Sequence, residues 1–313
     1  MPFAIDIRTN EPYPVIVLQD TGTGCEAEIY AFGGLLNAFS IMVNGSKTNV
    51  VDGFESVSDA VQNITPAFKS TKLSPFVCRM KNGEYGFDNQ DYKIDKFYLP
   101  PHAIHGLLYD AVFDIVSTHA DDNKAELELR YAYNAADKGY PFAFNITIRW
   151  KLEANHTLSV TTTVQHSNAF EIPYADGWHP YFTLGTSVDA CSLQFDSSLM
   201  LEFDETLIPT GKKMNDERFL HGSSLQDIFL DNCFELDEPG MSKCVLQNEQ
   251  LQLTICPDAS YGYLQVYTPP HRKSIAIENL SAAPDAFNNG IGLLLLYPNK
   301  AYSFTTSYIL NTL

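Results

Sequence analysis

Glu278 stands near the C-terminus, where a short apolar segment gives way to a polar loop. The surrounding sequence is IAIENLSAAPDAFNNG, in which Ile275 and Ile277 alternate with other residues as they would in a strand. Strand ends that open into polar loops are where a rigid scaffold presents working groups. We therefore take Glu278 as a candidate for chemistry, the alternative being a surface glutamate before an ordinary loop.

A second candidate is His179, which lies in the aromatic segment PYADGWHPYFTLG. Trp178 precedes it, and Tyr181 follows after a proline. Aromatic residues beside proline and glycine indicate a walled pocket, and aromatic walls suit the apolar faces of sugars. The alternative is a histidine that is satisfied within an aromatic core.

Three further residues are candidates by residue type and context. His105 follows a Pro-rich entry and precedes a glycine in PPHAIHGLLYD; its spacing from His102 would suit a metal pair, but no third ligand motif is near, so we expect no metal. The planar fork of Arg79 could clamp sugar hydroxyls or form a surface ion pair. Asp231 lies at the end of a possible strand.

The composition indicates a folded protein with an acidic surface. The chain has 313 residues, 45% of them hydrophobic, and its 38 acidic and 20 basic residues give a net charge of −18. A field of this sign repels nucleic acid and anionic membrane surfaces, so we expect neither as a partner. The N-terminal segment lacks the pattern of a signal peptide, and the six cysteines are scattered, so we expect a cytoplasmic protein with reduced thiols. The sequence leaves a monomer and a homodimer open.

Alternation of apolar and polar residues with a period of two dominates the chain. It predicts three long antiparallel strands over 125–133, 142–152 and 156–165, joined by turns at 137–139 and 153–155. Shorter predicted elements are strands at 15–18, 37–43, 112–118, 251–256, 263–268, 302–310 and, buried, 293–296, with one helix at 54–63. No strand–helix repeat or linker is present, so we expect residues 1–313 to form one all-β domain, a large antiparallel β-sandwich with few short helices.

With these segments in view, the chain resembles the aldose 1-epimerase family, the mutarotases typified by galactose mutarotase. The resemblance runs nearly end to end. It rests on IHGL around His105, on WHPYFTL around His179 and on ENLSAAPDAFN from Glu278 onward.

Other positions depart from the family pattern and mark a divergent branch. In SPFVCR the final arginine, Arg79, matches the family's arginine motif, but Ser74, Pro75 and Cys78 replace three of its fixed residues. These departures leave the preferred sugar open.

The resemblance implies a galactose mutarotase-like supersandwich and an isomerase that interconverts the α and β anomers of an aldose. The reaction removes the proton of the C1 hydroxyl and protonates the ring oxygen; the ring opens, C1–C2 rotates and the steps reverse. By resemblance Glu278 is the base and His179 the acid, while His105 holds the ring-oxygen region or assists proton transfer. These roles require Glu278 to ionise readily and His179 to hold its proton.

The resemblance also implies which residues contact the substrate, and it implies no cofactor or metal. Arg79 and Asp231 would bind hydroxyls, and we expect Trp178 and Tyr181 to contact the sugar, a small-molecule substrate. Neither a cofactor nor a metal is implied by the mechanism.

Three alternatives stay open at this point. A related enzyme could act on a hexose phosphate or another anionic sugar, for which the basic cluster 271–273 would supply charge. A non-catalytic carbohydrate-binding sandwich would keep Trp178, Tyr181 and Arg79. A glycoside hydrolase would use Glu278 with Asp231 on either side of the bond to be broken.

Overall fold

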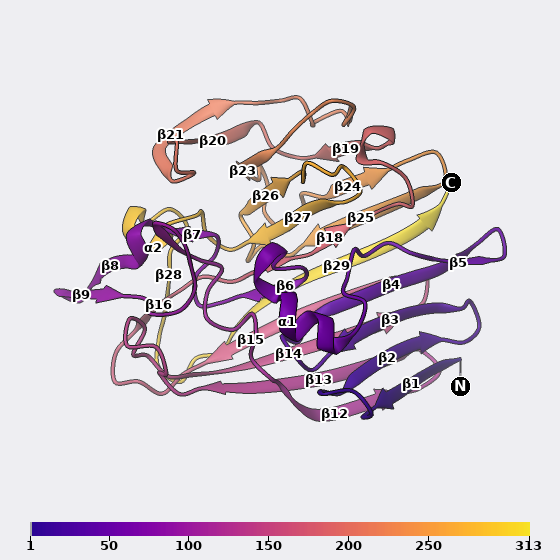
Figure 1. The fold of residues 1–313 in the computed structure, drawn as a ribbon, viewed down its shortest axis with the longest axis horizontal. Helices are drawn as coiled ribbons and strands as arrows, with labels where there is room; N and C mark the ends of the chain where they lie inside the picture. The colour runs from indigo at the N-terminus through magenta and orange to yellow at the C-terminus, as the bar shows by residue number, and fades with distance from the viewer. Residues whose placement is uncertain (1) are drawn as a thin grey trace.

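Three long strands lie next to one another in the largest sheet of the computed structural model, which describes residues 2–313 (Figure 1). They are β13 (Lys124–Tyr133), β14 (Phe144–Glu153) and β15 (Thr157–Gln165), paired antiparallel as the alternation predicted. A tight turn joins β14 to β15, and Asn155 and His156 take positive φ values of 59° and 50° there. The predicted meander is confirmed.

The predicted turn at 137–139 is wrong as a tight hairpin. β13 ends at Tyr133 and β14 begins at Phe144, so 137–139 lies within a longer connection. The cause is Asp137, whose carboxylate accepts hydrogen bonds from the backbone N–H groups of Asp95, Lys96 and Gly139. These bonds fold the connection onto a distant part of the chain.

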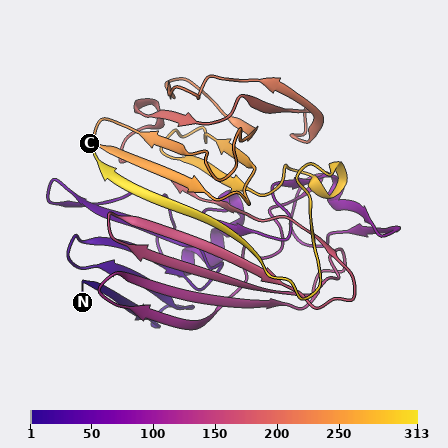
Figure 2. The ribbon, with the colours of Figure 1, turned by 180° about the vertical axis from the view of Figure 1, so that it is seen from behind.

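Nine strands make up the large sheet, in which β15 pairs with the C-terminal strand. The other members are β12 (Asp114–Ala120), β29 (Tyr302–Thr312), β25 (Leu251–Pro257), β24 (Cys244–Gln247), β19 (Ser192–Phe195) and β22 (Ser223–Ser224), in the order β12-β13-β14-β15-β29-β25-β24-β19-β22. Figure 2 shows the long strands of this sheet running side by side from behind.

Two further sheets complete the sandwich. The first contains β1 (Phe3–Arg8), β2 (Val15–Asp20), β3 (Cys25–Tyr30), β4 (Leu36–Val43) and β5 (Ser46–Asn49) in chain order. The second contains β21 (Pro209–Asn215), β20 (Leu199–Phe203), β23 (Asp231–Glu235), β26 (Tyr263–Tyr267), β27 (Ile275–Leu280), β17 (Gly177–His179) and β6 (Thr71–Leu73) in that order, with β18 (Tyr181–Phe182) also paired to β27.

One hydrophobic core joins the three sheets. Leu18 of β2, Ile148 of β14 and Ile277 of β27 belong to the same buried cluster. A bridge between Val51 and Phe182 links the five-stranded sheet to the eight-stranded one. The predicted all-β sandwich with few helices is confirmed.

Short elements close one end of the sandwich (Figure 1). They are β7 (Arg79–Met80), β10 (Tyr98–Leu99) and β11 (His102–Ile104) in one sheet, the pair β8 (Glu84–Phe87) and β9 (Gln90–Lys93), the pair β16 (Ile172–Tyr174) and β28 (Leu294–Leu296), and the 3-10 turn Lys81–Gly83. A second 3-10 turn, Val188–Ala190, precedes β19. The strand expected at 293–296 is therefore present but not buried as a whole, because only Leu296 is enclosed and Leu295 faces solvent in this small sheet.

Two helices occur among the described residues, α1 (Val57–Ala67) and α2 (Ala286–Asn289). The predicted helix at 54–63 corresponds to α1 but begins too early, because Ser56 caps the helix by accepting a hydrogen bond from the N–H of Asp59. It also ends too early, since α1 runs to Ala67 and stops at Phe68, which takes a left-handed φ of 53°. Neither helix is long and apolar enough to cross a membrane.

Candidate active site

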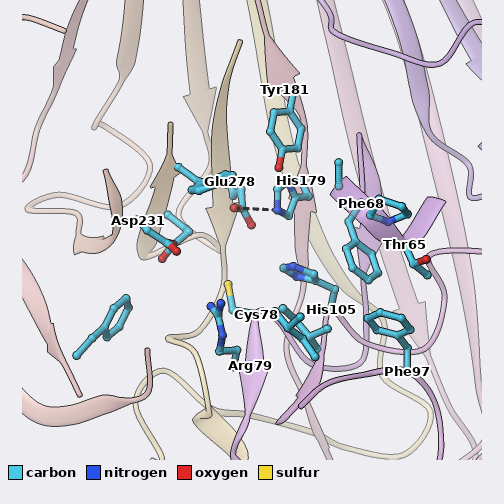
Figure 3. A pocket seen from close by; sticks show the side chains of 17 residues that line it. Thr65, Phe68, Cys78, Arg79, Phe97, His105, His179, Tyr181, Asp231 and Glu278 are labelled. Atoms are coloured by element: carbon cyan, nitrogen blue, oxygen red, sulfur yellow. Dashed lines mark hydrogen bonds and ion pairs between the residues drawn. The ribbon is translucent and has the colours of Figure 1, made fainter. Parts of the chain in front are cut away.

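A cavity of about 440 Å³ lies over β17, β23, β26 and β27 (Figure 3). A volume of this order is typical of a small-molecule site. Its lining residues are Thr65, Pro66, Ala67, Phe68, Cys78, Arg79, Phe97, Leu99, Ile104, His105, His179, Tyr181, Phe203, Asp231, Gln265, Tyr267 and Glu278. Six of the seven predicted site residues are thus brought together here.

Glu278 and His179 contact one another in the middle of the cavity. The Nε2 atom of His179 lies 3.3 Å from the Oε1 atom of Glu278, and both side chains are buried. Backbone pairing sets this contact, since β17 and β18 both pair with β27 and the N–H of Ile277 donates to the carbonyl of Pro180. The sequence suggested that Glu278 lies at the end of a strand. Instead β27 continues to Leu280, so Glu278 lies inside the strand.

The burial of this pair changes the acidity of both groups. Burial raises the pKa of Glu278 well above its ordinary value, the nearby Asp231 carboxylate raises it further, and the Arg79 charge lowers it. Burial lowers the pKa of His179 to about 4. The roles implied by the resemblance require an ionised Glu278 and a protonated His179, and in the ligand-free protein burial disfavours both charges.

These shifts still suit proton transfer. A carboxylate of raised pKa is a stronger base once it ionises, and an imidazolium of lowered pKa is a stronger acid. The neutral pair and the ion pair of Glu278 and His179 hold the same number of protons, so one proton moving across the contact interconverts them. Burial favours the neutral pair, and the Arg79 charge favours the ionised carboxylate.

His105 is held against this pair by its backbone. Its φ of 61° is left-handed, and its N–H donates to the carbonyl of Cys78 at 2.9 Å. The next residue must be glycine, because a Cβ on Gly106 would meet the carbonyl oxygen of Ser74 at 2.3 Å. The imidazole of His105 packs edge-on to that of His179, with 4.9 Å between ring centroids. Burial, then the positive fields of His179 and Arg79, lower its pKa well below the ordinary value.

Arg79 is positioned by the loop that follows Glu278. β7 pairs with β11, and the N–H of Asp285 donates to the carbonyl of Arg79 at 2.8 Å. The Asp285 carboxylate in turn accepts a hydrogen bond from the N–H of Lys81 at 2.8 Å. The PDAFN segment therefore fixes the strand that carries Arg79, a role that the sequence did not reveal.

Asp231 lies on the side of Glu278 away from His179 (Figure 3). It has a hydrogen-bond partner that was not among the residues predicted from the sequence. Gln265 donates from Nε2 to the Oδ1 atom of Asp231 at 2.8 Å, and it stands directly opposite Glu278 in the pairing of β26 with β27. Burial raises the pKa of Asp231, while Arg79 and the hydrogen bond from Gln265 lower it. The signal for Gln265 was a glutamine between two apolar residues of a predicted strand.

The two aromatic neighbours of His179 point to different places. Tyr181 lines the cavity and stacks on the ring of His179, with centroids 5.0 Å apart. Trp178 lies outside the cavity lining and packs edge-on to Trp150 in the core. The expected sugar contact of Trp178 is therefore corrected: successive strand residues face opposite sides, so Trp178 and His179 cannot both face the cavity.

Two other sequence features also lie apart from the cavity. The guanidinium of Arg272 donates to the Asp189 carboxylate and to the carbonyls of Leu225 and Ile228, so this part of the 271–273 cluster has a structural role. His102 accepts a hydrogen bond at Nδ1 from the N–H of Asn82. Within residues 2–313 no group of three or more His, Cys, Asp and Glu side chains is arranged to hold a metal ion.

Several polar atoms of the site are buried and have no hydrogen-bond partner among the described residues. They are Nδ1 of His105, Nδ1 of His179, Oε1 of Gln265 and Oε2 of Glu278. Leaving such an atom unpaired costs about 1–3 kcal/mol, so these atoms are poised to bind the donors and acceptors of a polar ligand.

The chain has recognisable relatives. The family profile described as aldose 1-epimerase matches residues 14–309. The uncharacterised protein YihR of Escherichia coli K12 is 30% identical over 238 residues, which make up 74% of this chain and 75% of YihR. The aldose 1-epimerase of Streptococcus thermophilus is 25% identical over 209 residues, or 64% of this chain and 58% of that protein.

Solved structures share the fold over almost the whole chain. A galactose mutarotase-like protein from Clostridium acetobutylicum has a TM-score of 0.86 at 17% identity, covering 100% of this chain and 99% of that one. Galactose 1-epimerase from Lactobacillus acidophilus NCFM has a TM-score of 0.82, also at 17% identity, covering 99% and 98%. These likenesses confirm the predicted galactose mutarotase-like sandwich. With the profile match from residue 14 to residue 309, the chain belongs to the aldose 1-epimerase family.

Proposed function

We propose that this protein is an aldose 1-epimerase, an isomerase that interconverts the α and β anomers of a free sugar. The observation that carries the proposal is the buried contact between Glu278 and His179, surrounded by unpaired polar atoms. Anomer exchange needs one base and one acid within reach of the two oxygens bonded to C1, the hydroxyl oxygen O1 and the ring oxygen O5. The contact supplies both groups.

The reaction is a proton transfer through a ring-opened aldehyde. The Glu278 carboxylate takes the proton of the C1 hydroxyl, C1 becomes a carbonyl, and the electrons of the C1–O5 bond pass to O5. His179 gives its proton to O5. After rotation about C1–C2 the same groups work in reverse on the other face. Each such group contributes on the order of 10²- to 10⁴-fold to the rate.

Other side chains of the cavity hold the ring. Arg79 donates to hydroxyl oxygens through its fork, and Asp231 accepts from hydroxyls while Gln265 steadies it. Tyr181 supplies an aromatic edge beside His179. We propose that His105 supports the ring oxygen, since its imidazole lies next to that of His179.

Anomer exchange at equilibrium tests the proposal. Saturation transfer by NMR between the α and β C1–H signals measures exchange for a panel of free aldoses, with and without the protein. The proposal expects faster exchange for at least one aldose. Unchanged exchange across the panel would overturn it.

Adding hexose phosphates and aryl glycosides to the panel separates the alternatives. An anionic-sugar epimerase would accelerate hexose phosphates above free sugars. Among the described residues that line the cavity, Arg79 is the one Lys or Arg, and its charge already acts on the carboxyl groups of Glu278 and Asp231. A hydrolase would release phenol from aryl glycosides. A carbohydrate-binding protein would broaden sugar signals without speeding exchange.

A further inference from the structure

The cavity has a polar side and an apolar side. Figure 3 shows Asp231 and Glu278 on one side and Phe68 and Phe97 on the other, with His105 between them. We call the second side the apolar wall. It is formed by the end of α1 and by the segment 97–104, and its members are Thr65, Pro66, Ala67, Phe68, Phe97, Leu99 and Ile104.

The apolar wall offers little to a hydroxyl group. Thr65 supplies its single side-chain hydroxyl, and the other members are apolar. Phe97 is only half-buried, packed edge-on to Phe68, and Leu99 is 48% exposed at the mouth. Apolar side chains left open beside a polar site mark a surface that binds an apolar group.

The chemistry of the ring indicates which part of a sugar meets the apolar wall. This step rests on the proposed function, in which Glu278 acts at O1 and His179 at the ring oxygen O5. Carbon C5 is bonded to O5 and carries the exocyclic carbon C6. The ring of Phe68 lies 4.6 Å from that of His105, which itself packs against His179, so the apolar wall follows His179 on the side away from Glu278. A C5 substituent extends in that direction.

We infer that the preferred substrate is an aldose whose C5 substituent is apolar, as in a 6-deoxyaldose or an aldose alkylated on O6. A C6 hydroxyl placed against the apolar wall would lose its water and find few partners there. A methyl group in the same place is removed from water at a gain. A pocket of this kind separates such substrates by roughly 10- to 100-fold in kcat/KM.

Matched sugar pairs test the inference. The exchange kinetics of D-galactose and 6-deoxy-D-galactose, and of D-glucose and 6-deoxy-D-glucose, are measured by saturation transfer with the wild-type protein. We expect the deoxy member to have the higher kcat/KM in at least one pair, by about tenfold or more. Ratios near one, or a preference for the hydroxymethyl member in both pairs, would overturn the inference while leaving the epimerase intact. No exchange with any sugar would overturn the epimerase itself.

Two variants connect the preference to the apolar wall. Phe97→Gln and Leu99→Gln should each lower the ratio of deoxy to parent sugar, and Leu99→Gln is the safer for folding because its side chain is already half exposed. Leu295→Gln is the matched control, since Leu295 is 38% exposed and lies outside the cavity lining. If both wall variants keep the wild-type ratio of kcat/KM for the deoxy sugar to kcat/KM for its parent, the preference does not come from the apolar wall.

Thr65 provides the complementary test. If its hydroxyl bonded a C6 hydroxyl, Thr65→Val would lower kcat/KM for the parent sugar alone. We expect the Thr65→Val protein to keep a higher kcat/KM for the deoxy sugar than for its parent. Selective loss of activity on a parent sugar that the wild type prefers would overturn it.

Discussion

The Nε2 atom of His179 and the Oε1 atom of Glu278 are 3.3 Å apart, and both side chains are buried at the floor of the cavity. The pair can exist as a neutral acid and imidazole or as an ion pair. Burial favours the neutral form, and a bound polar ligand would favour the charged one. We therefore expect the binding of a sugar to bring the pair into its working protonation state.

The pH dependence of exchange should report the surroundings of Glu278. The working pair holds one proton, carried by His179 while Glu278 is ionised, so kcat/KM should fall as pH rises through the raised pKa of Glu278 in the free enzyme, where that proton is lost. Asp231 raises that pKa and Arg79 lowers it, so Asp231→Asn should move this midpoint down and Arg79→Met should move it up. Profiles of kcat/KM against pH for the three proteins check this. Midpoints that move in the same direction would contradict the placement of the charges.

Acidification should destabilise the fold partly through His179. Its pKa is about 4 in the folded protein against an ordinary 6.5, so the unfolded chain binds more protons between these values and stability falls as pH falls through the window. The associated loss is on the order of 3 kcal/mol. His179→Gln should lack it, so its free energy of unfolding should fall less between pH 6.5 and 4 in urea titrations. The raised pKa of Glu278 acts with the opposite sign, because its folded form holds the extra proton. Parallel losses in the two proteins would exclude His179 as a source.

A fully buried ion pair behind the catalytic strands should dominate the effect of single substitutions on stability. Lys72 donates to Asp176 at 2.5 Å and to the carbonyl of Gly177, the ammonium lies over the ring of Trp178, and neither charged side chain is exposed. Tyr261 completes the site by donating to Asp176 at 2.8 Å. Lys72→Met should therefore cost about 3–5 kcal/mol, since it leaves a buried carboxylate without its charge partner.

A double-mutant cycle checks that prediction. Lys72→Met combined with Asp176→Asn should cost less than the two single changes added together, because the second change removes the orphaned charge. Lys93→Met is the matched control, as Lys93 pairs with Glu84 on the surface, and it should change the free energy of unfolding little. Additive losses in urea titrations would show that the buried charges do not depend on one another.

Gln265 should matter for substrate binding through Asp231. Gln265→Leu removes the donor that holds the Asp231 carboxylate, so we expect KM to rise by about tenfold, which corresponds to the loss of one hydrogen bond to a charged group. Gln252→Leu is the control, because Gln252 donates to Gln247 outside the cavity. Steady-state exchange rates give both constants. An unchanged KM would mean that Asp231 needs no support from Gln265.

Much of the fold follows from local alternation, while parts of the site follow from pairing between distant segments. The period of two predicts β13 to β15 because it is a property of neighbouring residues. The end of β27 was misplaced because Asn279 looks like a loop residue, yet it pairs with Leu264 of β26 and its side-chain amide donates to Thr306 of β29. That bond joins segments 27 residues apart and leaves no local signal.

The site residues divide in the same way, into those that local sequence predicts and those that depend on pairing between distant segments. His179 and Tyr181 are two residues apart and share a face, so strand geometry alone predicts both and excludes Trp178. Gln265 reaches the site through its register with Glu278, which becomes visible only once β26 and β27 are paired. The apolar wall was missed for the same reason, because α1 and the segment 97–104 meet only in the folded chain.

Anomer exchange by Glu278→Gln tests the central claim most directly. The amide keeps the shape of the side chain and its cavity but cannot take a proton, whereas Glu126→Gln, which alters a glutamate paired with Lys124 away from the site, serves as the control. For a sugar that the wild type exchanges, Glu278→Gln should lower kcat by on the order of 10²- to 10⁴-fold while the control keeps wild-type activity and both remain folded. A folded Glu278→Gln protein that exchanges anomers at the wild-type rate would contradict the assignment of Glu278 as the base.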